Sequence, residues 1–385
     1  MSEAIEQFKI EVSEADLADL RDRLDRTRWP DQIPGSGWDY GTDLGYLKEL
    51  CEYWRTKYDW YAWERELNRY EHYRTAIDGQ NVHFLHARSP VADALPLVVT
   101  HGWPGSVFEF YKILGPLTDP EAHGGDARDA FHVVCPSIPG YGWSGPTTEP
   151  GWDVRRVAQT FAKLAARLGY SRYGAQGGDW GAIISVHLGH VDPEHVAGIH
   201  LNMVPAGPPA GAADPMEGVT PEEVAGFASY GEFEANETGY QKIQGTKPQT
   251  LGYALTDSPA GLAGWIVEKF RTWSDCDGDV ERCFTKDELL TNVMIYWVTH
   301  TINSSVRLYC ESMRSGLFGP AGARLEVPTG CAIFPKEIIR PPRRWAEASF
   351  DVRHWSVMES GGHFAALEEP AVLVEDVRAF YRELR

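Results

Sequence analysis

Residues 173–184 have the sequence YGAQGGDWGAII, in which a short strand runs into Gly-x-Asp-x-Gly and then into a helix. Tyr173–Gln176 are suited to a buried strand, and the apolar pattern of Trp180–His190 predicts a helix. Asp179 would then stand on a sharp turn, where bulky neighbours would clash and glycine is favoured on both sides. The motif Gly-x-Asp-x-Gly alone is weak evidence for a functional site, because about one chain in four of this glycine content would contain it by chance. The strand before it and the helix after it make it a candidate site.

Strands and helices alternate on both sides of this turn. A hairpin is expected around Asp78-Gly79, between the runs 73–77 and 82–86. Buried strands are then expected at Leu95–Thr100, Phe131–Cys135, Tyr173–Gln176, Val196–Leu201, Cys331–Phe334 and His354–Val357, with helices such as Val154–Leu168 between them. This order predicts an α/β fold in which a mostly parallel sheet carries helices on both faces.

Residues 206–320 break the alternation. They begin with the Pro/Gly/Ala-rich run PAGPPAGAADP and continue with helical patterns and few strand signals. Ligands bind beyond the carboxyl ends of the strands in such sheets, so an inserted helical module there would cover the site as a lid. The expected organisation is an N-terminal meander with the first strands (1–90), two parts of the core (91–205 and 321–385) and the helical lid between them (206–320).

Composition excludes several classes of function. The 385 residues are 43% hydrophobic and 24% charged, as in a packed globular protein, and the net charge of −19 disfavours nucleic acid and anionic membranes. No run approaches the roughly 20 apolar residues of a membrane helix, and the acidic N-terminus is not a signal peptide. The six cysteines include no CxxC pair, so we expect a cytoplasmic protein with reduced thiols and neither metal nor cofactor.

The turn resembles the nucleophile elbow of the α/β hydrolases, with aspartate in place of the usual serine. A carboxylate that attacks an acyl group would give an uphill anhydride, whereas attack on an sp³ carbon gives an ordinary ester. Asp179 as nucleophile therefore indicates an alkylating substrate, either an epoxide or an alkyl halide.

Two further segments fit this chemistry. His101–Ser106 (HGWPGS) directly follows a strand, where α/β hydrolases place an oxyanion-hole loop, although a tight Gly/Pro turn would have the same composition. The backbone N–H groups of Trp103 and Trp180 are the candidate donors. His363, in Glu359–Phe364 (ESGGHF), follows the last strand and is the candidate general base.

A base histidine needs an orienting carboxylate. Glu337 follows the strand before His363, which is the usual place for this acid, although a solvated surface glutamate beside Lys336 is the plainer interpretation. Asp351 is a rival, at the start of the next strand, and the strand end near Asn202 offers no acid.

Taken together, these motifs are similar to those of the microsomal-type epoxide hydrolases, including juvenile-hormone-type and bacterial members. The resemblance covers nearly the whole chain, through Arg28-Trp29-Pro30, HGWPGS at 101–106, GGDWG at 177–181, TKP at 246–248, DSPAGL at 257–262, LLTNVM at 289–294, Tyr296-Trp297 and GGHFAALEEP at 361–370. It implies the α/β-hydrolase fold, with Asp179 as nucleophile, His363 as base and Glu337 as acid. It also implies two lid tyrosines, Tyr240 and Tyr309, that donate hydrogen bonds to the epoxide oxygen.

The resemblance implies that the substrates are water and an epoxide, which we expect to be aromatic or bulky, and that the product is a vicinal diol. The chain lacks the membrane anchor of the microsomal enzyme, so we expect a soluble protein. A homodimer is the common oligomeric state for such a protein. A role in detoxification or in antibiotic biosynthesis of the enediyne type is also implied.

Two other functions stay open. A haloalkane dehalogenase shares the aspartate elbow but needs a halide clamp, for which Trp103 and Trp180 could be mistaken. A non-catalytic binding protein on the same fold predicts an incomplete set of catalytic residues.

Overall fold

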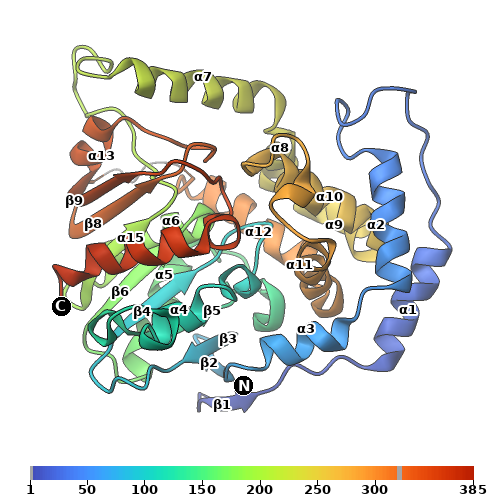
Figure 1. Cartoon of the computed structure of the whole chain (residues 1–385), viewed down its shortest axis with the longest axis horizontal. Coiled ribbons are helices and arrows are strands. Elements are labelled where there is room, and N and C mark those ends of the chain that lie inside the picture. The colour runs from blue at the N-terminus through green and yellow to red at the C-terminus, as the bar shows by residue number, and fades with distance from the viewer. Residues whose placement is uncertain (1–2, 319–322) are drawn as a thin grey trace.

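A computed structural model describes residues 3–318 and 323–385 of the chain (Figure 1). The described residues form one nine-stranded sheet with the order β1-β2-β3-β5-β4-β6-β7-β8-β9. β3 pairs with β5 antiparallel, and every neighbouring pair from β5 to β9 is parallel, so the expected mostly parallel sheet is confirmed. The strands are β1 (Glu6–Phe8), β2 (His72–Ile77), β3 (Gln80–Ala87), β4 (Leu95–Thr100), β5 (Phe131–Pro136), β6 (Tyr173–Gly177), β7 (Val196–Leu201), β8 (Leu325–Ile333) and β9 (Phe350–Val357).

The winding of the chain reverses at β4. From β4 the chain runs to β5 on one side, and it then returns past β4 to β6, β7, β8 and β9 on the other. Right-handed crossovers therefore place α4 on the opposite face of the sheet from α5 and α6, and Figure 1 shows α4 and α15 in front of the strands. Ligand sites form where the strand order reverses, which points to the carboxyl ends of β4 and β6. The helices of this part are α4 (Leu114–Thr118), α5 (Val154–Arg167), α6 (Asp179–Val191), α13 (Arg343–Ser349), α14 (Ala365–Glu368) and α15 (Pro370–Arg382).

A helical insertion connects β7 to β8. Figure 1 shows α7 running apart from the others, above α15 and β9, while α8 to α12 gather beside the sheet. The expected end of the lid at residue 320 lies outside the described residues. The helices of the insertion are α7 (Pro221–Asn236), α8 (Gly239–Thr246), α9 (Pro248–Asp257), α10 (Pro259–Trp273), α11 (Lys286–Thr299) and α12 (Ile302–Arg314).

The N-terminal helices α1 (Glu14–Asp25), α2 (Leu44–Thr56) and α3 (Trp60–Leu67) pack against the insertion. Leu17, Leu20 and Leu24 are buried at helical spacing, which is why α1 forms where the periodicity predicts it. Arg23 pairs with Asp257 at the end of α9, and the Thr42 hydroxyl donates to the Gly264 carbonyl of α10. The N-terminal segment therefore braces the inserted helices, and its buried side chains join the main hydrophobic core.

Two strand starts were wrong. β8 begins at Leu325 rather than Cys331, and β9 begins at Phe350 rather than His354. Pro328 has no backbone N–H and the ladder between β8 and β9 shifts register there, so the early part of β8 does not show a regular strand pattern. No helix within residues 3–318 or 323–385 has both the length and the apolar character needed to cross a membrane.

Candidate active site

Asp179 stands on a strained turn at the end of β6. Its backbone has a positive φ of 48°, which is uncommon for a residue with a side chain and typical of strained functional turns. A Cβ on Gly181 would overlap the Thr100 carbonyl of β4, and a Cβ on Gly177 would overlap the backbone of Gly181. Close packing of β4, β6 and α6 therefore requires both glycines and fixes the aspartate at the strand end.

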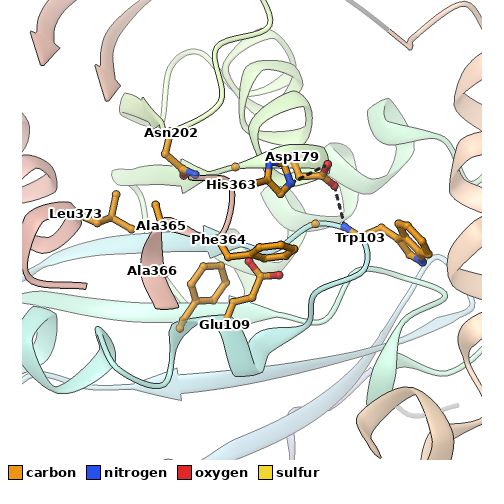
Figure 2. A pocket seen from close by; sticks show the side chains of 12 residues that line it. Trp103, Glu109, Asp179, Asn202, His363, Phe364, Ala365, Ala366 and Leu373 are labelled. Atoms are coloured by element: carbon orange, nitrogen blue, oxygen red, sulfur yellow. Dashed lines mark hydrogen bonds and ion pairs between the residues drawn. The ribbon is translucent and has the colours of Figure 1, made fainter. Parts of the chain in front are cut away.

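The Asp179 carboxylate has two partners. Its Oδ1 accepts a hydrogen bond from the Trp103 backbone N–H at 2.8 Å, and its Oδ2 lies 3.4 Å from His363 Nε2 (Figure 2). On the far side of the ring, His363 Nδ1 lies 2.7 Å from Glu337 Oε1. The Asp179 side chain is 18% exposed, whereas those of His363 and Glu337 are 2% and 1% exposed. The structure thus brings together the three residues expected from the sequence, with only the aspartate open to a ligand.

The 101–106 loop is held by α11. The Asn292 side chain donates to the Pro104 carbonyl at 2.7 Å and accepts from the Ser106 hydroxyl at 2.9 Å. The Tyr296 hydroxyl donates to the Gly105 carbonyl at 2.6 Å. These contacts fix the N–H of Trp103 toward Asp179. Trp180, the second residue of α6, has no intrahelical acceptor for its N–H, so that group is free to act as the second donor, and this role stays a prediction.

The histidine loop is held from both ends. The backbone N–H of His363 donates to the Trp273 carbonyl at the end of α10. Glu337 follows β8 by four residues, and its backbone neighbour Lys336 bonds to Gly361 of the histidine loop. Asp351, the rival acid, lies inside β9 and pairs with Arg353 instead.

Charges around His363 favour its protonated form. Burial alone would lower its pKa, but the carboxylates of Glu337 and Asp179 outweigh burial and raise the pKa of His363 well above its usual value. Esterification would remove the charge of Asp179 and so lower that pKa. A neutral imidazole, which can accept a proton, is thereby favoured after the nucleophile has reacted.

Tyr240 of α8 and Tyr309 of α12 lie together beside Asp179, at the same cavity. Both are buried, and their rings contact each other and the Trp103 indole. Burial and then the charge of Asp179 raise the pKa of the Tyr240 hydroxyl, and Tyr309 is raised well above the usual value for similar reasons. Both phenols are therefore protonated and able to donate a hydrogen bond.

A cavity of ≈ 420 Å³ joins these tyrosines to the nucleophile. Its walls are mainly apolar and aromatic and come from α6, the insertion and the segment after Glu337. The main lining residues are Asp179, Trp180, Phe227, Tyr230, Phe233, Tyr240, Tyr309, Phe318 and Trp345. Such a mainly apolar space with a few converging polar groups is typical of a small-molecule site.

A second, smaller cavity of ≈ 20 Å³ is bordered by Asp179 and by His363. Glu109 and Asn202 line it, and neither was expected from the sequence (Figure 2). Glu368 was also missed, although it accepts hydrogen bonds from the backbone of Asp275 and Phe364 and so fixes the histidine loop. Glu109 lies on a 3-10 turn, η1 (Val107–Phe110), three residues after HGWPGS, a position with no periodic signal.

No group of three or more His, Cys, Asp or Glu side chains that could hold a metal ion occurs among the described residues.

Comparisons with known proteins show the family. Residues 5–110 match the family described as "Epoxide hydrolase N terminus", and residues 96–277 match "alpha/beta hydrolase fold". A provisionally named epoxide hydrolase of Stigmatella aurantiaca (strain DW4/3-1) is 47% identical over 382 residues, which cover 99% of this chain and 86% of that protein. Epoxide hydrolase 1 of Oryctolagus cuniculus is 41% identical over 407 residues, which cover 98% of this chain and 89% of the rabbit protein.

A solved structure is similar over the whole chain. Juvenile hormone epoxide hydrolase from the silkworm Bombyx mori superposes with a TM-score of 0.92 at 35% identity, covering 100% of this chain and 95% of that one. The expected α/β-hydrolase fold is thereby confirmed.

Proposed function

The chain belongs to the epoxide hydrolase family and is an epoxide hydrolase, and on that premise we propose that it works through an ester on Asp179. The observation that carries this proposal is the line Glu337–His363–Asp179, with contacts of 2.7 Å and 3.4 Å, ending at the cavity that holds both tyrosines. In the first step, Asp179 Oδ2 attacks a ring carbon. The carbon–oxygen bond breaks, and the oxygen takes a proton from Tyr240 or Tyr309.

The second step hydrolyses the ester. His363 takes a proton from water, and the resulting hydroxide adds to Cγ of Asp179. Trp103 N–H, already on Oδ1, then donates to the oxygen that gains charge. The tetrahedral intermediate collapses, and His363 returns the proton to the departing alcohol. The carboxylic acid loses its proton, which restores the tyrosine, so that epoxide and water give a diol.

The main cavity supports an aromatic or bulky epoxide. Its volume of ≈ 420 Å³ is in the range of drug-sized ligand sites, and aromatic side chains from α7, α8 and α12 form much of its wall. A homodimer, a cytoplasmic location and a role in detoxification or enediyne-type biosynthesis stay predictions.

The proposal is tested by trapping the ester. His363→Gln protein, mixed with styrene oxide and weighed intact by mass spectrometry, is expected to gain the mass of one epoxide. Peptide mapping should place this mass on Asp179. The matched control is Asp179→Asn in the same background, which should gain nothing. An unmodified Asp179 in His363→Gln, together with diol from the wild type, would mean that water attacks the ring directly.

The two alternative functions considered from the sequence predict different products. A haloalkane dehalogenase would release halide from a bromoalkane faster than it forms diol, whereas an epoxide hydrolase with Tyr240 and Tyr309 as donors should prefer the epoxide. A non-catalytic binding protein would yield neither diol nor adduct across a panel of bulkier epoxides, whereas this chain brings together the proposed nucleophile, base and acid.

A further inference from the structure

Glu109 is a half-buried acid that the two-step mechanism does not use. It lies on η1, directly after the oxyanion loop, and lines the ≈ 20 Å³ cavity together with Asp179, His363 and Asn202. Figure 2 shows the Glu109 carboxyl group pointing away from η1, to the side of the pocket on which His363 and Asp179 lie. A Cβ on Gly105 would overlap this carboxyl, so the loop is shaped around it.

The charges around Glu109 come from several elements. Asp179 of α6 and His363 face it, and Tyr296 of α11 is near enough to feel its charge. On the other neighbours of η1, Glu288 of α11 pairs with Lys112, and Glu368 of α14 binds backbone N–H groups. Burial, opposed by His363 and assisted by Asp179, raises the pKa of Glu109 to about 8, while the N–H groups of Gly102 and Ser106 hold its oxygens. Its proton is therefore present at pH 7 and is available for donation.

The cavity has the size and polarity for a single water molecule. A site needs roughly 10–15 Å³ and two to four polar partners to hold one water, and this cavity offers ≈ 20 Å³ with Glu109, Asn202, His363 and Asp179 in its wall. The side-chain oxygen of Asn202, Oδ1, already accepts a hydrogen bond from the Gln176 amide at 2.8 Å. The position is also the one that the second step requires, because the imidazole base and the ester carbon both border it.

We propose that Glu109 is a positioning residue, which donates a hydrogen bond to the water of the second step and holds it between His363 and the Asp179 ester. The inference rests on the proposed ester mechanism and adds a residue to it. Glu109 exchanges no proton with the substrate. It orients the water oxygen so that one proton faces His363 Nε2 and a lone pair faces Cγ of Asp179.

The proposal gives the second step a particular pH dependence. Hydrolysis of the ester rises with pH as His363 becomes neutral. It should fall again as Glu109 ionises, because a carboxylate would add negative charge beside the developing oxyanion and could no longer donate. The fall should begin above pH 8, since the neutral His363 and esterified Asp179 of this step remove the larger effect that lowers the pKa of Glu109 together with the smaller one that raises it.

The test measures the two steps separately. Quenched-flow samples with styrene oxide are weighed intact, so that alkylation is the rise of the adduct and hydrolysis is its decay. Glu109→Leu should slow hydrolysis by about 10²-fold, the usual cost of a misplaced reactant, and change alkylation far less. Glu109→Gln keeps a donor of the same shape, so it should retain most of the rate at pH 7 and lose the alkaline fall.

Glu288→Gln is the matched control, because it removes a buried acid near the same loop that does not line the cavity. It should lower stability and keep the alkaline fall. An unchanged pH profile in Glu109→Gln, or unchanged hydrolysis in Glu109→Leu, would overturn the proposal. If Glu109→Leu does not fold, the Glu109→Gln profile decides alone. Absence of an ester in His363→Gln would overturn the ester mechanism itself, and this inference with it.

Discussion

At the scale of single residues, the two cavity tyrosines make the ring-opening step testable. Each phenol is protonated and lines the cavity that Asp179 also borders, so each can donate to the oxygen as the ring opens. Tyr240→Phe and Tyr309→Phe should each slow alkylation by about 10²-fold, as the loss of one preorganised donor does elsewhere. Stopped-flow alkylation rates check this.

The double variant should be slower than either single variant, and ester hydrolysis, measured on the ester that does form, should change little. Equal loss in both steps would mean that the tyrosines act on the fold rather than on the leaving oxygen.

At the residue scale, the sequence points to a site residue where a local constraint restricts the turn around it, while the catalytic roles stay predictions. Asp179 lies between glycines and His363 follows two of them, each on a turn after a strand. A side chain on Gly177, Gly181 or Gly362 would overlap backbone atoms. Glu337 was found from its position after a strand. Glu109 was not found from the sequence. Its proposed role depends on η1, α6 and the histidine loop meeting at one cavity, and no short motif encodes such a meeting.

At the scale of elements, α7 differs from the rest of the insertion. It begins with a capping box between Thr220 and Glu223, yet Gly226 is its one buried residue among the described positions. In α11, by contrast, every residue from Glu288 to Trp297 is buried. Phe227, Tyr230 and Phe233 of α7 form a wall of the main cavity, and its polar side is tied to the backbone of Arg343. A helix with so few core contacts should open locally at low free-energy cost.

Hydrogen–deuterium exchange should therefore be faster in residues 221–236 than in 286–299, by about two orders of magnitude if α7 opens without global unfolding. Trapping the styrene oxide ester in His363→Gln should slow exchange in α7, because the bound aryl group contacts its aromatic side chains. The Asp179→Asn form provides the matched control, with epoxide present and no ester formed. Equal protection of the two helices would show that α7 does not open independently of the rest of the chain.

Element-scale prediction was accurate for regular segments and weaker elsewhere. The strand Leu95–Thr100 and the helix Glu14–Asp25 match the sequence pattern, because each buries one continuous apolar set. The starts of β8 and β9 were missed, since the ladder there is irregular around Pro328. The N-terminal helices pack on α10 and α11, which lie far away in the sequence. Amphipathic spacing predicts that a helix has a buried face, but it does not predict which helix covers that face.

At the scale of the whole molecule, the net charge of −19 is a property whose effect on stability depends directly on salt and pH. Self-repulsion of like charges destabilises a compact protein, and salt screens it, with the Debye length falling from about 30 Å at 0.01 M to about 8 Å at 0.15 M. The free energy of unfolding should therefore rise with salt at pH 8. A gain of about 1 kcal/mol would raise Tm by roughly 1–3 °C for a chain of this length, by extension of smaller domains.

Differential scanning fluorimetry between 10 and 200 mM NaCl checks this, and pH provides the control. Near the sequence pI of ≈ 5.1 the net charge vanishes, so the same salt step should leave Tm almost unchanged. The charge should act on substrates too: kcat/KM for a carboxylated styrene oxide should rise with salt at pH 8, while that for styrene oxide stays level. A salt response of Tm that is equally large at both pH values would assign it to general exclusion of salt from the surface, and the overall charge would then have no part in it.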